Sequence, residues 1–211
     1  DSMSDPKIVK EIKLRLKKED KLLINKDKGI FDALNILLDN VDTEFFTWIG
    51  CDDIINESYN YNEIINLFND GHDIIQSNVI YFENDINKET RKIKSYNNSF
   101  IKYSFGLPFY HFGSTLRTDI VDKINLRFDI SRKTAADFEF FRKLFKSIKK
   151  TSIACLSSTI YLGDGGNSSA DLKSRIKGYT DIFQSFKNIR ILIFPIFLLI
   201  RTYFKLKSVV R

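Results

Sequence analysis

The 211-residue sequence has few of the residues that build covalent or metal-bound frameworks, with only two cysteines and two histidines. Cys51 and Cys155 are too few for a disulfide framework, which indicates a reducing cytoplasm, and we expect both to be small buried residues rather than reactive thiols. His72 and His111 have no partner at the spacing of zinc ligands. The aromatic and basic pattern of an RNA-binding sheet is also missing, so no nucleic-acid partner is expected.

Long hydrophobic runs are missing as well. The longest apolar run, 191–200, has ten residues, whereas a helix needs ~20 to span a bilayer. Pro195 interrupts it, Arg190 and Arg201 flank it, and further basic and aromatic residues follow. We therefore predict that residues 186–211 form a basic, amphipathic helical tail lying in the headgroup layer of a membrane. The alternative is a C-terminal helix packed on its own domain or on a partner subunit.

Apolar and aromatic residues are abundant. The chain is 43% hydrophobic and contains 19 phenylalanines and 9 tyrosines, which excludes a disordered chain and is enough for one domain with a substantial core. The net charge of +6 favours anionic partners such as a phosphorylated substrate or an acidic membrane surface.

One stretch organises the rest of the chain. Residues 45–49 read as a strand buried on both faces, Gly50 breaks the run, and Asp52 and Asp53 follow directly. In an open α/β sheet, ligands bind just beyond the ends of the strands. Two carboxylates there suit Mg²⁺ or Mn²⁺ shared with a substrate diphosphate. The alternative is a polar turn that merely ends the strand.

The remaining pattern alternates helices with strands. Helices are predicted over the following ranges: 5–16, 30–39, 61–68, 134–148 and 170–186. Strands are predicted over these ranges: 22–24, 45–49, 74–82, 91–96 as half of a hairpin, 110–116 and 153–162. This order is typical of an α/β doubly wound sheet. Such a fold opens with a strand, and Asp1 stands where the end of a strand is expected, so we expect the first strand to be missing.

Six segments, in this order, resemble segments of one enzyme family. They are Asp1-Ser2-Met3-Ser4-Asp5, Asp27-Lys28-Gly29-Ile30-Phe31-Asp32-Ala33-Leu34-Asn35, Trp48-Ile49-Gly50-Cys51-Asp52-Asp53, Pro108-Phe109-Tyr110-His111, Thr134-Ala135-Ala136-Asp137-Phe138-Glu139-Phe140 with Arg142, and Gly165-Gly166-Asn167-Ser168. Over residues 1–185 the chain resembles family 2 glycosyltransferases with the GT-A fold, closest to the bacterial colanic-acid type that builds exopolysaccharide and lipopolysaccharide. The resemblance implies a Rossmann-like mixed sheet flanked by helices.

The resemblance also implies roles for individual residues. Asp137 matches the catalytic base, Asp52 matches the residue that holds the divalent metal, and Asp53 is its neighbour. The implied donor-binding residues are Asp1, Asp27, Lys28, Gly29, Asp32 and Asn35. The implied acceptor or diphosphate residues are His111, Arg142, Gly165 and Gly166.

Each of these roles has a structural alternative. Asp137 and Asp32 could cap their helices, His111 could be a satisfied buried histidine, and Arg142 could be a salt-bridge partner. The sequence also departs from the family pattern. Gly50 stands where the family has an acid or Asn, which removes one oxygen and predicts weaker metal and nucleotide binding. Glu139 stands where Asp is common, a small change.

The resemblance as a whole implies an inverting, metal-assisted glycosyltransferase of surface-glycan synthesis. It would move a sugar from a nucleotide-sugar donor to a lipid-linked or polysaccharide acceptor, in the cytoplasm, peripherally on the inner face of the plasma membrane. A non-catalytic binding remnant of the same fold, or a membrane-surface adaptor, remains as an alternative. The donor sugar, linkage, acceptor and oligomeric state are not predicted.

Overall fold

The computed structural model describes the following residues: 4–57, 59–95, 111–132, 135–148, 153–163, 178, 180–184, 195–200 and 202–203. Its helices are α1 (Pro6–Arg15), α2 (Ile30–Leu38), α3 (Tyr61–Asn69), α5 (Thr118–Lys123), α6 (Ala136–Ser147) and the 3₁₀ turn η1 (His111–Gly113). Its strands are β1 (Phe45–Thr47), β2 (Ile54–Ile55), β3 (Ile74–Glu83), β4 (Asp85–Ile93), β5 (Ser114–Arg117) and β6 (Ile153–Gly163).

The strands form one mixed sheet in the order β1-β5-β3-β6-β2, with β4 paired to β3 as a hairpin. Strands β3 and β6 are parallel, whereas β5 is antiparallel to both β1 and β3. Consequently β1, β3 and β6 run in the same direction, so their carboxyl ends point toward the same edge of the sheet, although β1 already ends level with Ile75. The expected mixed α/β sheet is therefore confirmed, and this edge is where its ligands are expected.

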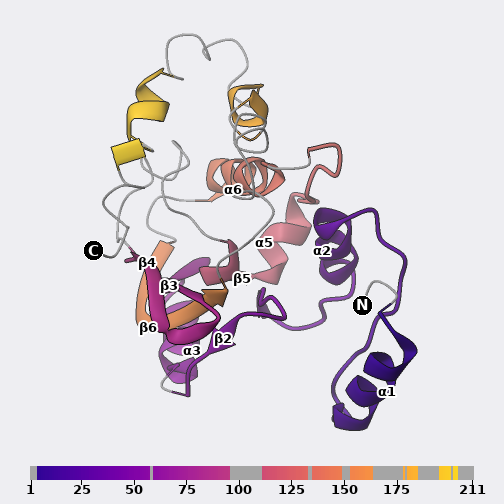
Figure 1. Ribbon diagram of the computed structural model, residues 1–211. Coiled ribbons are helices and arrows are strands. Elements are labelled where there is room, and N and C mark those ends of the chain that lie inside the picture. The colour runs from indigo at the N-terminus through magenta and orange to yellow at the C-terminus, as the bar shows by residue number, and fades with distance from the viewer. Residues whose placement is uncertain are drawn as a thin grey trace.

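Helices cover both faces of the sheet (Figure 1). Neighbouring residues of a strand point to opposite faces, so Ile74 packs into one core and Ile75 into the other. The first core joins the sheet to α6, whose Phe140 and Phe141 are buried around Trp48. The second core packs α3 against the other face. Together they fix where each helix meets the sheet.

Several elements predicted from the sequence are confirmed. Helix α1 begins at Pro6, with the Asp5 carboxylate accepting the Lys7 backbone N–H at 2.7 Å as its N-cap. Helices α2, α3 and α6 and strands β3 and β6 lie within a few residues of their predicted bounds. The predicted hairpin is also present, although β4 begins at Asp85, well before the predicted range.

Other predictions were wrong. Residues 22–24 form no strand, although all three are apolar. Strand β1 has only three residues, all of them partly exposed, because among the described strands it pairs only with β5. Of the strand predicted over 110–116, residues 111–113 form the turn η1 and only residues 114–116 belong to a strand, β5. Cys51 is exposed rather than buried.

The C-terminal segment is described only in part. Residues 195–200 and 202–203 are helical, and Phe197 is fully buried, with its ring 5.9 Å from that of Phe138 in α6. Within the described part of the chain, no helix has the length and apolar character needed to cross a bilayer. Most of the helix predicted over 170–186 lies outside the described residues.

Candidate functional site

The two acids after β1 have different surroundings. Asp53 is partly buried, and both of its carboxylate oxygens accept backbone N–H groups: Oδ2 from Gly50 at 2.6 Å and Oδ1 from Gly163 at 3.2 Å. Asp53 therefore fastens the turn after β1 to the end of β6. Burial raises the pKa of Asp53, the two backbone hydrogen bonds oppose that rise, and the charge of Asp52 adds to it.

Asp52, in contrast, is exposed. Its carboxylate lies directly against two glycines. A Cβ added to Gly163 would stand 2.7 Å from Asp52 Oδ2, and one added to Gly50 would stand 2.9 Å from Asp52 Oδ1. These separations are shorter than real Cβ contacts. The two glycines therefore make the space in which the Asp52 carboxylate sits.

Asp137 lies in the first turn of α6 and is partly buried, and its Oδ1 accepts the Phe138 backbone N–H at 2.8 Å. One turn further on, Phe140 and Phe141 pack edge-on against the indole of Trp48, at centroid distances of 5.8 and 6.3 Å. Trp48 directly follows β1, and Asp52 is four residues beyond it. The aromatic contacts thus hold the N-terminal half of α6 beside the strand that leads to the acids.

Other side chains near Asp137 are tied together by charge. Glu139 forms a salt bridge with Arg132 at 2.5 Å and with Lys143 at 3.3 Å. Arg142, one turn beyond Glu139, is partly buried, and its Nε is buried with no hydrogen-bond partner among the described residues. A buried guanidinium N–H without an acceptor suits an anionic ligand oxygen.

Four of the predicted donor-binding residues lie at the start of α2: Asp27, Lys28, Gly29 and Asp32. The Asp27 carboxylate accepts the Gly29 backbone N–H at 2.9 Å, and the Asp32 carboxylate accepts the Lys28 backbone N–H at 2.9 Å. Gly29 precedes α2 with φ of +123°, a left-handed conformation that favours glycine. These bonds shape the loop, and the predicted donor contacts remain predictions.

Asn35 has a structural role that the sequence did not reveal. Its amide donates to the Phe128 carbonyl at 2.9 Å and accepts the Phe128 backbone N–H at 2.8 Å, which ties α2 to a segment 93 residues away. The binding role predicted for Asn35 is untested. No spacing signal in the sequence could have identified this contact.

Some predicted site residues lie outside the description. Asp1, Gly165 and Gly166 are not among the described residues, and His111 is described only through its backbone in η1. Gly163, which directly follows the strand predicted over 153–162, was not predicted as a site residue, and the structure shows it against both acids. Its position at the end of a predicted strand was the available signal.

The side chains suit a metal ion held jointly by the protein and substrate phosphates better than a metal ion held by protein ligands alone. Among the residues that the structure describes, no group of three or more histidine, cysteine or carboxylate side chains could hold a metal. Mg²⁺ usually takes one or two protein carboxylates together with substrate phosphates, and the exposed Asp52 offers such a carboxylate. Asp53, already bonded to two backbone N–H groups, is better placed to support that turn.

Comparisons with known proteins identify the family and the fold. A family model described as Glycosyl transferase family 2 matches residues 4–145. A comparison with curated protein sequences gave no match. The fold is similar to S. aureus TarS 1–349 in complex with UDP-GlcNAc, with a TM-score of 0.64 and 18% identity over 88% of this chain. It is also similar to the same fragment without the ligand, at 0.56 and 16% over 86%. The similarity covers 55% and 52% of those chains, so this chain spans about half their length.

Proposed function

The chain belongs to glycosyl transferase family 2, and we propose that it transfers a sugar from a nucleotide-diphosphate donor to a hydroxyl of a glycan or lipid-linked acceptor, with inversion at the anomeric carbon. The observation that carries the proposal is that both acids are connected to Trp48, one through the turn that follows it and the other through the helix whose phenylalanines pack on it. Asp52 is exposed in the turn between β1 and β2, and Asp137 stands at the start of the helix that packs on that tryptophan. We place the reaction between them.

In this mechanism Asp137 is the general base. Its carboxylate accepts the proton of the acceptor hydroxyl as that oxygen forms a bond to the anomeric carbon of the donor sugar. The bond between that carbon and the diphosphate oxygen breaks, and its electron pair leaves with the diphosphate. Attack from the face opposite the leaving group inverts the configuration, which needs one carboxylate base and no covalent intermediate.

Asp52, supported by Asp53, would hold a Mg²⁺ or Mn²⁺ ion. When bound, that ion would offset the negative charge on the departing diphosphate. Arg142 supports the same task, because its buried Nε lacks a protein acceptor among the described residues and can donate to a phosphate oxygen. Asp27, Lys28 and the start of α2 line the proposed donor side.

We propose UDP-GlcNAc as the first donor to test, because a complex of that ligand is known for a protein of similar fold. The bacterial exopolysaccharide or lipopolysaccharide acceptor is proposed from the motif resemblance alone. A donor panel is therefore the direct test. The 211-residue chain, with Mn²⁺, would be scanned for donor hydrolysis and for transfer.

The test compares variants of matched chemistry. We expect Asp137→Asn to lower turnover by about 10²-fold or more, since a general base contributes about 10²- to 10⁴-fold. Asp122→Asn, an exposed aspartate on α5, is the control and should retain full turnover. No turnover of any donor, or equal turnover by Asp137→Asn, would refute the proposal. Normal surface glycan in cells carrying Asp52→Ala with Asp137→Asn would establish the non-catalytic alternative.

We also propose that the tail, residues 186–211, rests on an anionic membrane surface. The tail has no acidic residue. Its helical part is anchored by the buried Phe197, while Ile196, Leu199 and Tyr203 are 53%, 73% and 59% exposed. Spacings of three and four residues place these three on one side of a helix. Their exposed apolar surface, flanked by basic residues, suits a headgroup layer.

A further inference from the structure

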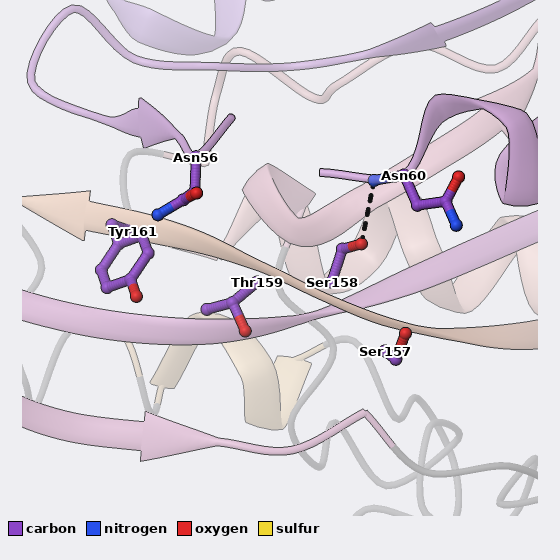
Figure 2. Close-up of a pocket in the computed structure, with 6 residues that line it drawn as sticks. All are labelled: Asn56, Asn60, Ser157, Ser158, Thr159 and Tyr161. Carbon is purple, nitrogen blue, oxygen red and sulfur yellow. Dashed lines mark hydrogen bonds between the residues drawn. The ribbon is translucent and has the colours of Figure 1, made fainter. Parts of the chain in front are cut away.

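A pocket separate from the two acids lies between β6 and the residues that follow the short strand β2. It has a volume of about 330 Å³, at the small end of the range of about 300–1,000 Å³ for ligand sites. Its lining residues all carry hydroxyl or amide side chains, and they are Asn56, Asn60, Ser157, Ser158, Thr159 and Tyr161. Figure 2 shows Asn56 and Tyr161 close together at one end of the pocket, and Asn60 and Ser158 at the other.

The lining contains hydrogen-bonding groups and an aromatic ring but no charge. Hydroxyl and amide groups both donate and accept, as the hydroxyls of a sugar do. The tyrosine ring adds an apolar face with a polar tip, which suits the C–H face of a sugar ring. A nucleotide diphosphate, in contrast, needs cationic or backbone N–H partners, so this pocket does not suit the donor.

A local irregularity in β6 shapes the pocket. Along the parallel pair, Gln76 faces Cys155 but Asn78 already faces Thr159, so β6 carries extra residues at 156–158. The bulge is held by the Asn78 side chain, which donates to the Ser157 carbonyl at 2.8 Å, and by the Asn60 backbone N–H, which donates to the Ser158 hydroxyl at 3.0 Å. Bulges of this kind redirect side chains next to binding sites.

The pocket is connected to the acids through one face of β6. Residues two apart on a strand point to the same side, so Thr159, Tyr161 and Gly163 share a face. Gly163 is the residue that lies against the Asp52 carboxylate. At about 3.3 Å per residue, Tyr161 is about 7 Å and Thr159 about 13 Å from Gly163 along the strand. A chain of a few linked sugar rings could cover that length.

We propose that this pocket binds uncharged sugar residues of the acceptor glycan, at a distance from the reacting hydroxyl. The proposal rests on the proposed function. It assigns to Asn56, Thr159 and Tyr161 a role in selecting long, neutral acceptors, with Asn56 and Thr159 as hydrogen-bonding groups and Tyr161 as the stacking surface. Short acceptors would react without using the pocket.

Binding is tested on the full chain without donor. The probes are cellotetraose, maltotetraose and chitotetraose, with tetragalacturonate as the anionic comparison, each at millimolar concentration. We expect at least one neutral tetrasaccharide to shift the backbone amide NMR signals of Asn56, Thr159 and Tyr161, and tetragalacturonate to leave them unchanged. No shift with any neutral probe, or equal shifts with the anionic one, would overturn the inference.

Variants then locate the site. Asn56→Ala and Tyr161→Ala should lower the affinity for the tetrasaccharide about fivefold or more, which is the loss expected for a single hydrogen bond or stacking contact. Tyr161→Phe, which keeps the ring and the packing, should lower this affinity less. Asn87→Ala, an exposed asparagine on β4, is the control and should bind as the wild type does. Equal affinity of all four variants would overturn the inference.

Kinetics separate this inference from the proposed function. In the Asn56 and Tyr161 variants the KM for a tetrasaccharide acceptor should rise about fivefold or more, whereas donor hydrolysis and kcat stay unchanged. If transfer depends on Asp137 but the Asn56 and Tyr161 variants keep the wild-type KM for the tetrasaccharide acceptor, the role of the pocket is rejected and the proposed function stands. Tetrasaccharide binding at the pocket without any transfer would reject the proposed function and leave the binding site standing.

Discussion

Replacing Gly163 with alanine tests whether the Asp52 carboxylate must occupy its observed position. The alanine keeps the backbone N–H that donates to Asp53, so the link between the turn after β1 and β6 is preserved. The added Cβ would stand 2.7 Å from Asp52 Oδ2, 3.1 Å from its Cγ and 3.2 Å from its Cβ. Because three atoms of one short side chain are contacted, the whole Asp52 side chain must move.

The size of that movement sets the expected effect. An ordinary contact begins near 3.4 Å, so Oδ2 must move by about 0.7 Å. Metal–ligand distances tolerate only about 0.2 Å, and a misplacement of ~1 Å in an active site costs about 10²-fold. We therefore expect Gly163→Ala to lower Mn²⁺-dependent affinity for UDP-GlcNAc, or for the donor identified by the panel, by about 10- to 100-fold. Global stability should change by less than about 1 kcal/mol, since alanine also restricts the unfolded chain.

The assay is a double-mutant cycle read by isothermal titration. The four proteins are the wild type, Gly163→Ala, Asp52→Ala and the double variant, each titrated with and without Mn²⁺. Asp52→Ala removes the two closest atoms that the new Cβ meets. If Gly163→Ala acts through Asp52, it should have no further effect in that background, giving a coupling of at least ~1.4 kcal/mol.

Two results would refute the reasoning. The first is full Mn²⁺-dependent affinity in Gly163→Ala, which would mean that the position of the Asp52 carboxylate does not matter. The second is the same fractional loss in both backgrounds, which would mean that Gly163 acts through another contact. Chemical denaturation of all four proteins checks that the fold is retained.

Three further predictions concern the pH dependence of stability and binding to a membrane. Burial raises the pKa of Asp53 above its ordinary value of 3.8, so relative to Asp53→Asn the wild type should lose stability as the pH rises from 3.8 through that raised pKa. Hydrogen bonds from Ser131, chiefly its hydroxyl, lower the pKa of Asp129, so relative to Asp129→Asn the wild type should lose stability as the pH falls below 3.8. Urea midpoints from about pH 3 to about pH 7 measure both, and parallel curves for the two variants would contradict the argument. In the tail, Leu199→Asp should weaken binding to phosphatidylglycerol vesicles about tenfold, because it removes one apolar side chain that the membrane would bury. Leu14→Asp on α1 is its matched control, because these leucines are 73% and 77% exposed, and equal losses in a flotation assay would exclude a specific membrane role for the tail.

Helices α1, α2, α3 and α6 were predicted well because their signal is local, whereas the six-residue α5 was not predicted. The apolar spacing in α3 and α6 depends only on the sequence of each segment. The Asp5 N-cap is equally local, because the backbone N–H that its carboxylate accepts belongs to Lys7, two residues away. Strands depend on their neighbours. Residues 22–24 are as apolar as many strands, yet they form none, because a strand exists only where another strand pairs with it.

The candidate site shows the same division. The sequence pointed to Asp52, Asp53 and Asp137 through short motifs, since each motif sits where a strand ends or a helix begins. It did not indicate that Asp53 bonds to Gly163, 110 residues away, or that Asn35 bonds to Phe128. Contacts across such separations follow from the register of the sheet, which no local pattern encodes.

Gly50 illustrates why a departure from a family pattern needs a structure before it is interpreted. The missing side chain predicted weaker metal and nucleotide binding and supported the reading of a non-catalytic remnant. In the fold, a Cβ at this position would stand 2.7 Å from Asp53 Oδ2 and 2.9 Å from Asp52 Oδ1. Asp53 Oδ2 also accepts the N–H of Gly50 itself. An asparagine or aspartate at position 50 would therefore displace the two acids that follow it. The space that its side chain would need already holds carboxylate oxygen, so the observed positions of Asp52 and Asp53 require a glycine here. The lost oxygen at position 50 is then no argument against catalysis, and the exposed carboxylate of Asp52 becomes the group on which donor binding should depend.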